Sequence, residues 1–523
     1  MKMVKSLLLG SAAGFAALTG AQAADLPVKA KPVEYVRICS LYGAGFYYIP
    51  GTDTCIRVGG HIRAEIVFGG RGTNQQIWFA GDGNSTRTRD RDFFFTRARS
   101  FINLDTRTQT SFGTLRTFSV LRAEHATPVG LGAAATVMGL DAAIIQWGGF
   151  TIGRAGTSYF DNPWAYAYKW GANGSLGWPD TAGGRFVAAY THQFGNGISG
   201  TLSLEDGKER KRGNYNGTNA LTAALGLGLQ GSVPGVDTRG GNTWPEVVGQ
   251  LRIDQAWGGF HLSAMAVNNH VAYNCGGASG TTTVAAGGCS ELSGNPSDKV
   301  GYGVHGAFKF NTPTGVNDAL YIGATWSKGA TTNVFDNIGQ GSTFALYGGS
   351  DGVLTYGSIT GGFLFDSVYT TTTRTGAGLT VGPTGQQLTT AYGGTIAFEH
   401  GWNAEWRTSV FGGAQVVDYN DTANAILCSR FAGILTNAAG ASLHNTTACD
   451  WDYRIVGAGT RTFWTPVRDL TIGVEFMWTN HHVSHADGVI FNQPAINNFK
   501  PDARYEIRDQ NVFSGMFSVR RFF

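Results

Sequence analysis

The sequence is poor in charge and lacks any long hydrophobic run. Asp, Glu, Lys and Arg make up 14% of its 523 residues, against about 25% in ordinary soluble domains. Beyond residue 23, no apolar stretch reaches the length of about 18 residues that a membrane-spanning helix needs. The formal net charge is only +3. A helical membrane anchor is therefore excluded, and nucleic-acid binding has no electrostatic support.

Helical patterns and catalytic motifs are also scarce. From Ala24 onward no amphipathic helix longer than two turns is predicted, and no GxSxG motif for nucleophilic catalysis occurs. The cluster HHVSH (481–485) brings three histidines together, but no cysteine or carboxylate lies at a known metal-binding spacing. We interpret these histidines as part of a solvated loop. An enzyme, a metal site and a cofactor are not expected.

Glycine, with 77 residues, and aromatic residues, at 12%, are abundant. They accompany segments in which polar and apolar side chains alternate. The segment IRVGGHIRAEIVF (56–68) places Arg57, His61, Arg63 and Glu65 on one parity and apolar residues on the other. Because successive side chains of a strand point to opposite faces, such a segment predicts a strand with one polar and one apolar face.

Short turns and long connections separate these strands. Seven tight turns are predicted at 111–113, 147–149, 195–197, 257–259, 312–315, 401–403 and 466–469. They join fourteen strands, and one further strand lies at each end, which gives sixteen. Connections rich in Gly, Asn, Ser and Thr lie between the hairpins. An even strand count with short turns on one side predicts an all-β fold, a 16-stranded antiparallel transmembrane β-barrel.

A soluble β-sandwich would alternate in the same way, but two features oppose it. The strand-like segments are 9–15 residues long, longer than the usual 5–6 and suited to tilted membrane strands. Aromatic residues such as Trp147 and Trp257 stand at the level of the turns, as in an interfacial girdle. The long segment 330–389 is predicted to add an outer hairpin from 343–348 and 361–370.

The N-terminal residues predict export. Lys2 and Lys5 precede an apolar run and a small-residue cleavage site, which is the pattern of a signal peptide. We therefore expect a signal peptide over 1–23, a periplasmic N-terminal segment over 24–54 and the barrel over 55–523.

The cysteines form three close pairs along the sequence. These are Cys39 and Cys55, Cys275 and Cys289, and Cys428 and Cys449. Six cysteines allow 15 pairings, but an exported chain is oxidised and each close pair brackets a segment rich in small polar residues. Local disulfides are therefore favoured, each stabilising by about 3 kcal/mol. We expect the first at the periplasmic entry to the first strand and the other two in external loops.

Two stretches carry a resemblance to a known family. ADLPVKAKPVEYVRICSLYGAGFYYIPGTDTCIRVGG (24–60) and FSGMFSVRRFF (513–523) resemble the start and the end of mature alphaproteobacterial outer-membrane porins. Phe523 resembles the aromatic residue that ends such barrels, whereas Arg521 departs from the aromatic of enteric porins. The resemblance implies a homotrimer of barrels, each a general diffusion channel for ions and small hydrophilic solutes.

The resemblance also implies that the third long loop, 156–184, folds into the lumen and faces basic residues on the wall. The polar parity of the first six strands is rich in arginine, and the loop adds two carboxylates. We therefore expect the pore to be lined by Arg57, Arg63, Arg97, Arg99, Arg107, Arg116, Arg122, Arg154, Asp161 and Asp180. Because guanidinium stays charged, this set predicts a weak anion preference that fades with added salt.

Other interpretations stay open at this point. The arginines are equally compatible with a wall network around Glu65, Asp105 and Glu124 that has no effect on permeation. A selective channel with a site for a sugar or an anion is the second functional hypothesis, and a structural envelope protein is the third. The expected partners are outer-membrane lipid, lipopolysaccharide and two further copies, with peptidoglycan bound through the basic segment 24–33.

Overall fold

The computed structural model describes most of the chain. The described residues are 37–68, 94–127, 135–170, 184–208, 211–217, 239–272, 296–335, 343–348, 357–371, 373–376, 379–431, 435–436, 449–493 and 503–523. The chain divides into two compact units, Met1–Ile56 and Arg57–Phe523. Each unit is described by itself.

The described part of the first unit is a small disulfide-bonded fold. It contains a 3-10 turn, η1 (Ser40–Tyr42), and a short strand, β1 (Tyr47–Tyr48), that pairs antiparallel with residues 55–56. Cys39 and Cys55 are bonded and lie, fully buried, against Phe46. The predicted first disulfide is therefore confirmed.

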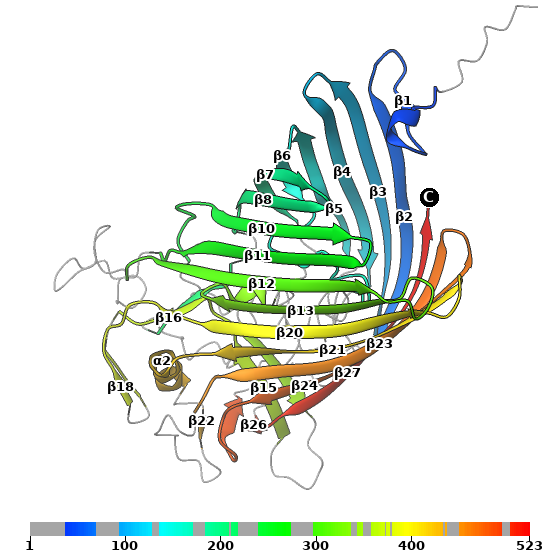
Figure 1. The fold of residues 1–523 in the computed structure, drawn as a ribbon. Coiled ribbons are helices and arrows are strands. Elements are labelled where there is room, and N and C mark those ends of the chain that lie inside the picture. Colours follow the sequence, from blue (N-terminus) through cyan, green and yellow to red (C-terminus); the bar gives the residue numbers. More distant parts are fainter. Residues whose placement is uncertain are drawn as a thin grey trace, which may run out of the picture. The chain divides into compact units, whose positions relative to one another are not determined.

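The second unit is built around a closed antiparallel barrel (Figure 1). Its sixteen strands are β2 (Cys55–Phe68), β3 (Phe94–Thr110), β4 (Gly113–Ala126), β5 (Ala135–Trp147), β6 (Phe150–Ala155), β7 (Arg185–Gly195), β8 (Ile198–Glu205), β10 (Glu246–Gln255), β11 (Gly258–Asn269), β12 (Lys299–Asn311), β13 (Ala319–Lys328), β20 (Thr390–Gly401), β21 (Trp406–Asp418), β23 (Tyr453–Val467), β24 (Leu470–Val483) and β27 (Gln510–Phe522). Strand β27 pairs with both β24 and β2, which closes the sheet. The predicted strand number is confirmed.

All seven predicted tight turns join consecutive strands of the barrel. In the turn between β7 and β8, Asn196 and Gly197 have φ values of 48° and 71°. Asparagine and glycine adopt this left-handed conformation most readily, so the local sequence fixes this hairpin. Among the described residues, no helix is long and apolar enough to cross a membrane.

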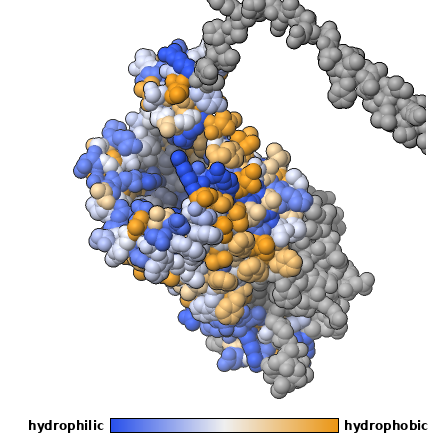
Figure 2. All heavy atoms as spheres, turned by 90° about the vertical axis from the view of Figure 1, so that its right-hand side faces the viewer, coloured by the Kyte–Doolittle hydropathy of each residue, from blue (hydrophilic) through white to orange (hydrophobic). Residues whose placement is uncertain are grey.

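The alternation of side chains also follows the prediction. On β2, Ile62 is 57% exposed on the outside of the barrel, whereas Glu65 is 3% exposed on the inside. The side chains of Ile322 on β13 and Ile396 on β20 are also exposed. Figure 2 shows apolar side chains gathered in a band on the outer surface, next to a hollowed region that is mostly polar. Such an outer face suits lipid, and the inner face suits water.

Further elements lie outside the barrel sheet and form a folded assembly. They comprise β9 (Asn214–Asn216), η5 (Thr331–Asn333), β14 (Thr343–Gly348), β15 (Gly357–Phe363), β16 (Ser367–Tyr369), β17 (Arg374–Gly376), β18 (Leu379–Val381), β19 (Gln387–Leu388), α2 (Asp421–Phe431), β22 (Leu435–Thr436), β25 (Ile490–Gln493) and β26 (Ala503–Ile507). The first arm of the predicted extra hairpin, 343–348, is present as β14, which pairs with β15. The predicted second arm, 361–370, is wrong in its bounds, because it overlaps β15 only over 361–363 and its later part, β16, pairs with β9 and β19 instead. These elements pack around a buried apolar cluster, and we call them the cap.

The expectation that no helix exceeds two turns is wrong for α2. This helix has 11 residues, about three turns. The Asn420 side chain accepts a hydrogen bond from the Ala423 backbone N–H, 2.9 Å, and so caps its N-terminus. Only Ala423, Ile426 and Leu427 form its buried stripe before Cys428. A stripe this short is not distinguished from a loop by periodicity alone.

Candidate functional site

The segment 156–170, which follows β6, lies inside the barrel. Its first half is held by side chains from the inner face of the opposite strands. The Gln250 amide donates to the Tyr159 carbonyl, 3.0 Å, and the Ser263 hydroxyl donates to the Phe160 carbonyl, 2.8 Å. Both donors stand on neighbouring strands, β10 and β11.

The second half of the segment is held from another part of the wall. The Arg461 guanidinium donates to the Ala167 carbonyl at 2.5 Å, and the Trp170 backbone N–H donates to the Glu475 carboxylate at 2.6 Å. Because backbone groups in the lumen need such partners, these contacts fix the path of the loop. The implied inward fold of this loop is thus present over 156–170.

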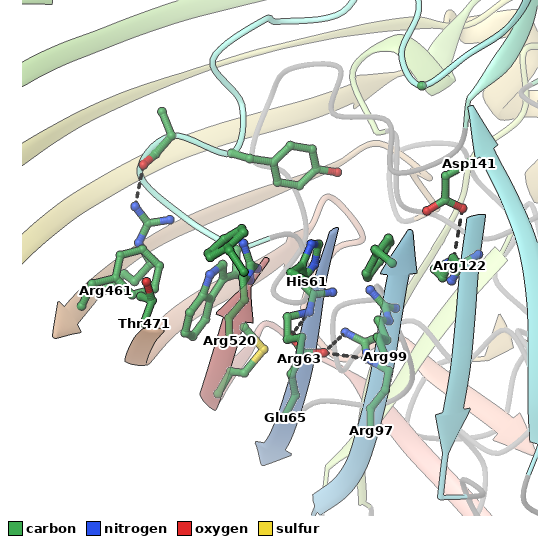
Figure 3. Close-up of a pocket in the computed structure, with 18 of the residues that line it drawn as sticks. His61, Arg63, Glu65, Arg97, Arg99, Arg122, Asp141, Arg461, Thr471 and Arg520 are labelled. Carbon is green, nitrogen blue, oxygen red and sulfur yellow. Dashed lines mark hydrogen bonds and ion pairs between the residues drawn. The ribbon is translucent and has the colours of Figure 1, made fainter. Parts of the chain in front are cut away.

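A cavity of about 400 Å³ lies between this loop and the wall (Figure 3). Its charged lining consists of Arg63, Arg97, Arg99, Arg122, Arg407, Arg461, Arg520, Glu65 and Asp141. Seven arginines thus face only two carboxylates within the cavity. His61, Phe101, Phe463 and Phe522 contribute aromatic surface.

Glu65 holds two of these arginines. Its carboxylate accepts hydrogen bonds from Arg97 Nε at 2.7 Å and lies 2.6 Å from Arg97 Nη2. Arg63 Nε is 2.9 Å away on the other oxygen. Glu65 and Arg97 are both 3% exposed. A buried charge is stable only when it is paired, so this carboxylate holds the arginine side chains in place.

A second carboxylate continues the network on β4. Glu124 lies 2.7 Å from Arg99 Nε and 2.6 Å from Arg122 Nη1. Arg122 Nε in turn is 3.0 Å from Asp141, which occupies an extra position of β5. The wall arginines on β3 and β4 therefore belong to an ion-pair network and also line the cavity.

Arginines from the C-terminal half of the chain line the other side of the cavity. Arg461 on β23 is 2.8 Å from the Glu399 carboxylate, and Arg407 on β21 lies 3.9 Å from it. The Arg407 side chain is 50% exposed. Arg520 on β27 also lines the cavity. The positive excess is therefore greatest where β21, β23 and β27 face the loop.

Three of the predicted residues lie elsewhere on the wall. Asp105, 1% exposed, lies 2.9 Å from Arg107, 3.0 Å from Arg116 and 3.9 Å from Arg57. Arg116 also donates to the Gln146 amide oxygen, 2.8 Å. These arginines form a network close to the turn end of β3 and β4 and do not line the cavity of about 400 Å³.

The last three predicted pore residues are Arg154, Asp161 and Asp180. Arg154 shares its parity with Phe150 and Ile152, which are 54% and 50% exposed, so strand geometry places it on the outward-facing parity. Its guanidinium donates to the Leu140 carbonyl, 3.0 Å. Asp161 is buried in the loop and accepts from the Ser158 N–H. Asp180 lies outside the described residues.

Sequence reasoning missed Arg407, Arg461 and Arg520. Their strands show the same alternation as β2, so parity marks them as inward-facing once the barrel is assumed. Their closeness to Arg63 follows only from barrel closure. The histidine cluster was misread in part. His481 lies in β24 and is 1% exposed, because the cap covers the end of that strand, so it is not a solvated loop residue.

The cap holds buried charge and a second disulfide. Cys428 and Cys449 are bonded and join α2 to the segment before β23, which confirms the third predicted pair. Cys275 and Cys289 lie outside the described residues. The Asp366 carboxylate accepts hydrogen bonds from the Thr331 N–H and hydroxyl, both 2.8 Å. Burial raises the pKa of Asp366, although these hydrogen bonds oppose the shift.

Asp452 makes the cap sensitive to pH. Burial, together with the nearby carboxylates of Asp450 and Asp418, raises the pKa of Asp452 to about 6. The folded cap therefore binds a proton more tightly than the unfolded chain does, and its stability falls as pH rises from about 4 to about 6. We expect faster proteolysis of the cap at pH 7.5 than at pH 5, and a smaller difference in Asp452→Asn.

Asparagine retains the acceptor for the Tyr419 N–H, now 2.7 Å from Asp452. Comparing variants at each pH cancels the pH dependence of the protease. Asp487→Asn, at an exposed position of the same region, is the control. If the ratio of the proteolysis rates at pH 7.5 and pH 5 were equal for the wild type and Asp452→Asn, Asp452 would not be the source of the pH dependence.

Comparisons with known proteins agree with this architecture. The profile of the family described as the porin subfamily matches residues 25–516. Porin Omp2b of Brucella suis is 34% identical over 273 residues, covering 49% of this chain and 64% of that relative. Porin Omp2a of Brucella melitensis is 33% identical over 261 residues, covering 45% and 65%. The crystal structure of the outer membrane channel DcaP of Acinetobacter baumannii covers 91% of this chain and 99% of its own, with a TM-score of 0.54 at 10% identity.

Proposed function

Because the chain belongs to the porin subfamily, we propose that it forms a water-filled channel for the passive diffusion of ions and small hydrophilic solutes. Its family and its closed barrel place it in the outer membrane of a Gram-negative cell. The observation that carries the proposal is the cavity between the wall and the loop 156–170, with its lining of arginine and carboxylate side chains. A lumen lined by ionised groups stays hydrated, and hydration is what a passing ion requires.

The proposal includes a pore role for the arginines. Arg63, Arg97, Arg99 and Arg122 are proposed to set the potential of the constriction, while Arg57, Arg107 and Arg116 contribute farther along the wall. The excess of arginine over carboxylate in the cavity supports an anion preference. At about 0.15 M salt the screening length is about 8 Å, so the preference should be weak and should fade with added salt.

A channel is proposed here in preference to an enzyme. Catalysis on a pore wall would need a nucleophile held by a base, and that base held by a third group. The buried histidines instead bond to wall hydroxyls. His305 shares a hydrogen bond of 2.8 Å with Thr325, and His261 one of 3.2 Å with Ser263.

The outer surface supports a homotrimer. Lipid-facing strands should be apolar, as they are at Leu262, Phe308 and Ile322. The outward parity of β2 to β5 differs because small and weakly polar residues stand there among exposed apolar residues such as Ile62, Ile102 and Leu121. The small and weakly polar residues are Gly60, Ala64, Ala98, Ser100, Thr106, Thr108, Thr117, Ser119, Ala123 and Ala143. We propose this face as the contact between copies and the remaining face as the contact with lipid and lipopolysaccharide.

Two further proposals concern the N-terminal part. Residues 1–23 are proposed as a signal peptide and 24–54 as a periplasmic segment that precedes the barrel, 55–523. The basic stretch 24–33 is proposed to bind peptidoglycan through Lys29 and Lys31. It lies outside the described residues.

Planar-bilayer recording tests the proposed function. We expect large ohmic conductance with closures in three equal steps, and free passage of neutral solutes up to a size limit. In a KCl gradient the reversal potential should show a small preference for chloride that shrinks as salt is raised. No conductance would refute the channel. A clear cation preference would mean that the described arginines do not dominate the constriction.

A further inference from the structure

Two arginines face each other at the seam where the barrel closes. Arg63 on β2 and Arg520 on β27 are directly paired across neighbouring strands. Both side chains line the cavity (Figure 3). Residues in such a pair have Cβ atoms about 4.5–5.5 Å apart, and like charges there repel each other. An unrelieved pair of this kind inside a barrel needs a compensating negative charge.

Among the described residues, only one of the two arginines forms an ion pair with a carboxylate. Arg63 lies 2.9 Å from Glu65, which also pairs with Arg97. Arg520 forms no ion pair with any residue of the described ranges, and its guanidinium lies over the ring of Phe522, with Cζ 5.6 Å from the ring centroid. Arg520 therefore presents hydrogen-bond donors to the cavity without a carboxylate partner.

Neighbouring groups extend this donor set. Thr471 on β24 is paired directly with Arg520 on its other side, and its hydroxyl faces the same cavity. Arg407 is half-exposed across the cavity. Its ion pair with the Glu399 carboxylate is long, at 3.9 Å. Phe101 and Phe463 form apolar surface beside these donors. Apolar surroundings strengthen the attraction between a guanidinium and an anion.

We propose that Arg63, Arg520 and Thr471, with Arg407 opposite, form a binding subsite for solutes carrying a carboxylate or phosphate group. Guanidinium groups bind both oxyanions through paired N–H donors. Their side-by-side placement favours an anion with two negative charges or several oxygen atoms over chloride. The inference rests on the proposed channel. It adds to the weak anion preference a saturable binding step on the permeation path.

The test uses inorganic phosphate and succinate on the full-length protein in a planar bilayer, with succinamide as the uncharged control. At constant ionic strength, phosphate and succinate should each reduce the chloride current in a saturable manner. Arg520→Gln should weaken the apparent affinity about tenfold. Removing one of two repelling cations does not threaten the fold. Arg468→Gln, in the exposed turn after β23, is the matched control and should behave as the wild type.

Block by phosphate alone would assign the subsite to phosphate groups, and block by both probes would assign it to oxyanions in general. A wild-type channel that conducts but shows no saturable reduction by either probe would overturn the subsite and leave the channel intact. Equal affinities for the wild type and Arg520→Gln would also overturn it. Calorimetric titration of both probes into detergent-solubilised protein needs no conductance, so it tests the subsite even if the channel proposal fails.

Discussion

Replacing Glu65 by glutamine is expected to destabilise the barrel by about 3–5 kcal/mol, since breaking a buried ion pair leaves an uncompensated charge. Glu65 is 3% exposed and forms ion pairs with Arg97 and Arg63 at 2.6 and 2.9 Å. Glutamine preserves the shape but supplies no negative charge. Arg97, also buried, would lose its closest carboxylate and keep the longer ion pair with Glu124 at 3.7 Å.

The loss should appear as a lower temperature for the mobility change of the folded barrel in denaturing gels. Glu405→Gln, at an exposed position in the turn before β21, serves as the control. Glu65→Gln combined with Arg97→Gln should recover part of the loss, because both charges are then absent. A midpoint for Glu65→Gln equal to that of the wild type would show that Glu65 does not hold the wall.

The same substitution should increase the anion preference of the channel. It removes one of the two carboxylates that line the cavity while all seven arginines remain. The reversal potential in a KCl gradient should therefore move further toward chloride. This readout separates the electrostatic role of Glu65 from its role in stability, because it is recorded on channels that have folded.

Replacing residues 158–169 by a short Gly-Ser linker is expected to raise the unit conductance on the order of twofold, because current follows the free cross-section of a pore. In the folded protein this segment occupies the lumen, with Phe160 and Tyr168 fully buried. Tyr168 packs against Tyr321 and Phe411 of the wall, with ring centroids 5.3 and 6.0 Å apart. Removing it opens that space to water.

Single-channel recording and the size limit for neutral solutes measure this effect. Phe112→Ala is the control, because the Phe112 ring is 73% exposed in a tight turn and has no place in the lumen. The barrel strands keep their pairing in both variants. An unchanged conductance in the loop variant would show that the narrowest point lies elsewhere, for instance in the cap.

Local sequence determined the barrel itself. Alternation identified the inward face of β2, and turn residues such as Asn196 and Gly197 fixed where hairpins reverse. Both signals act over a few residues, so they can be read without knowledge of the fold. The pairing of Cys39 with Cys55 and of Cys428 with Cys449 was predictable for the same reason, because each closes a short segment.

Only the tertiary structure decided the composition of the cavity. Arg520 meets Arg63 because the last strand pairs with the first, and no local pattern encodes that closeness. Arg154 was expected in the constriction, but strand parity turns it outward. Helix α2 was missed because its short apolar stripe is buried only by packing against the other elements of the cap. Contacts between residues far apart in sequence depend on closure and packing, which local propensities do not specify.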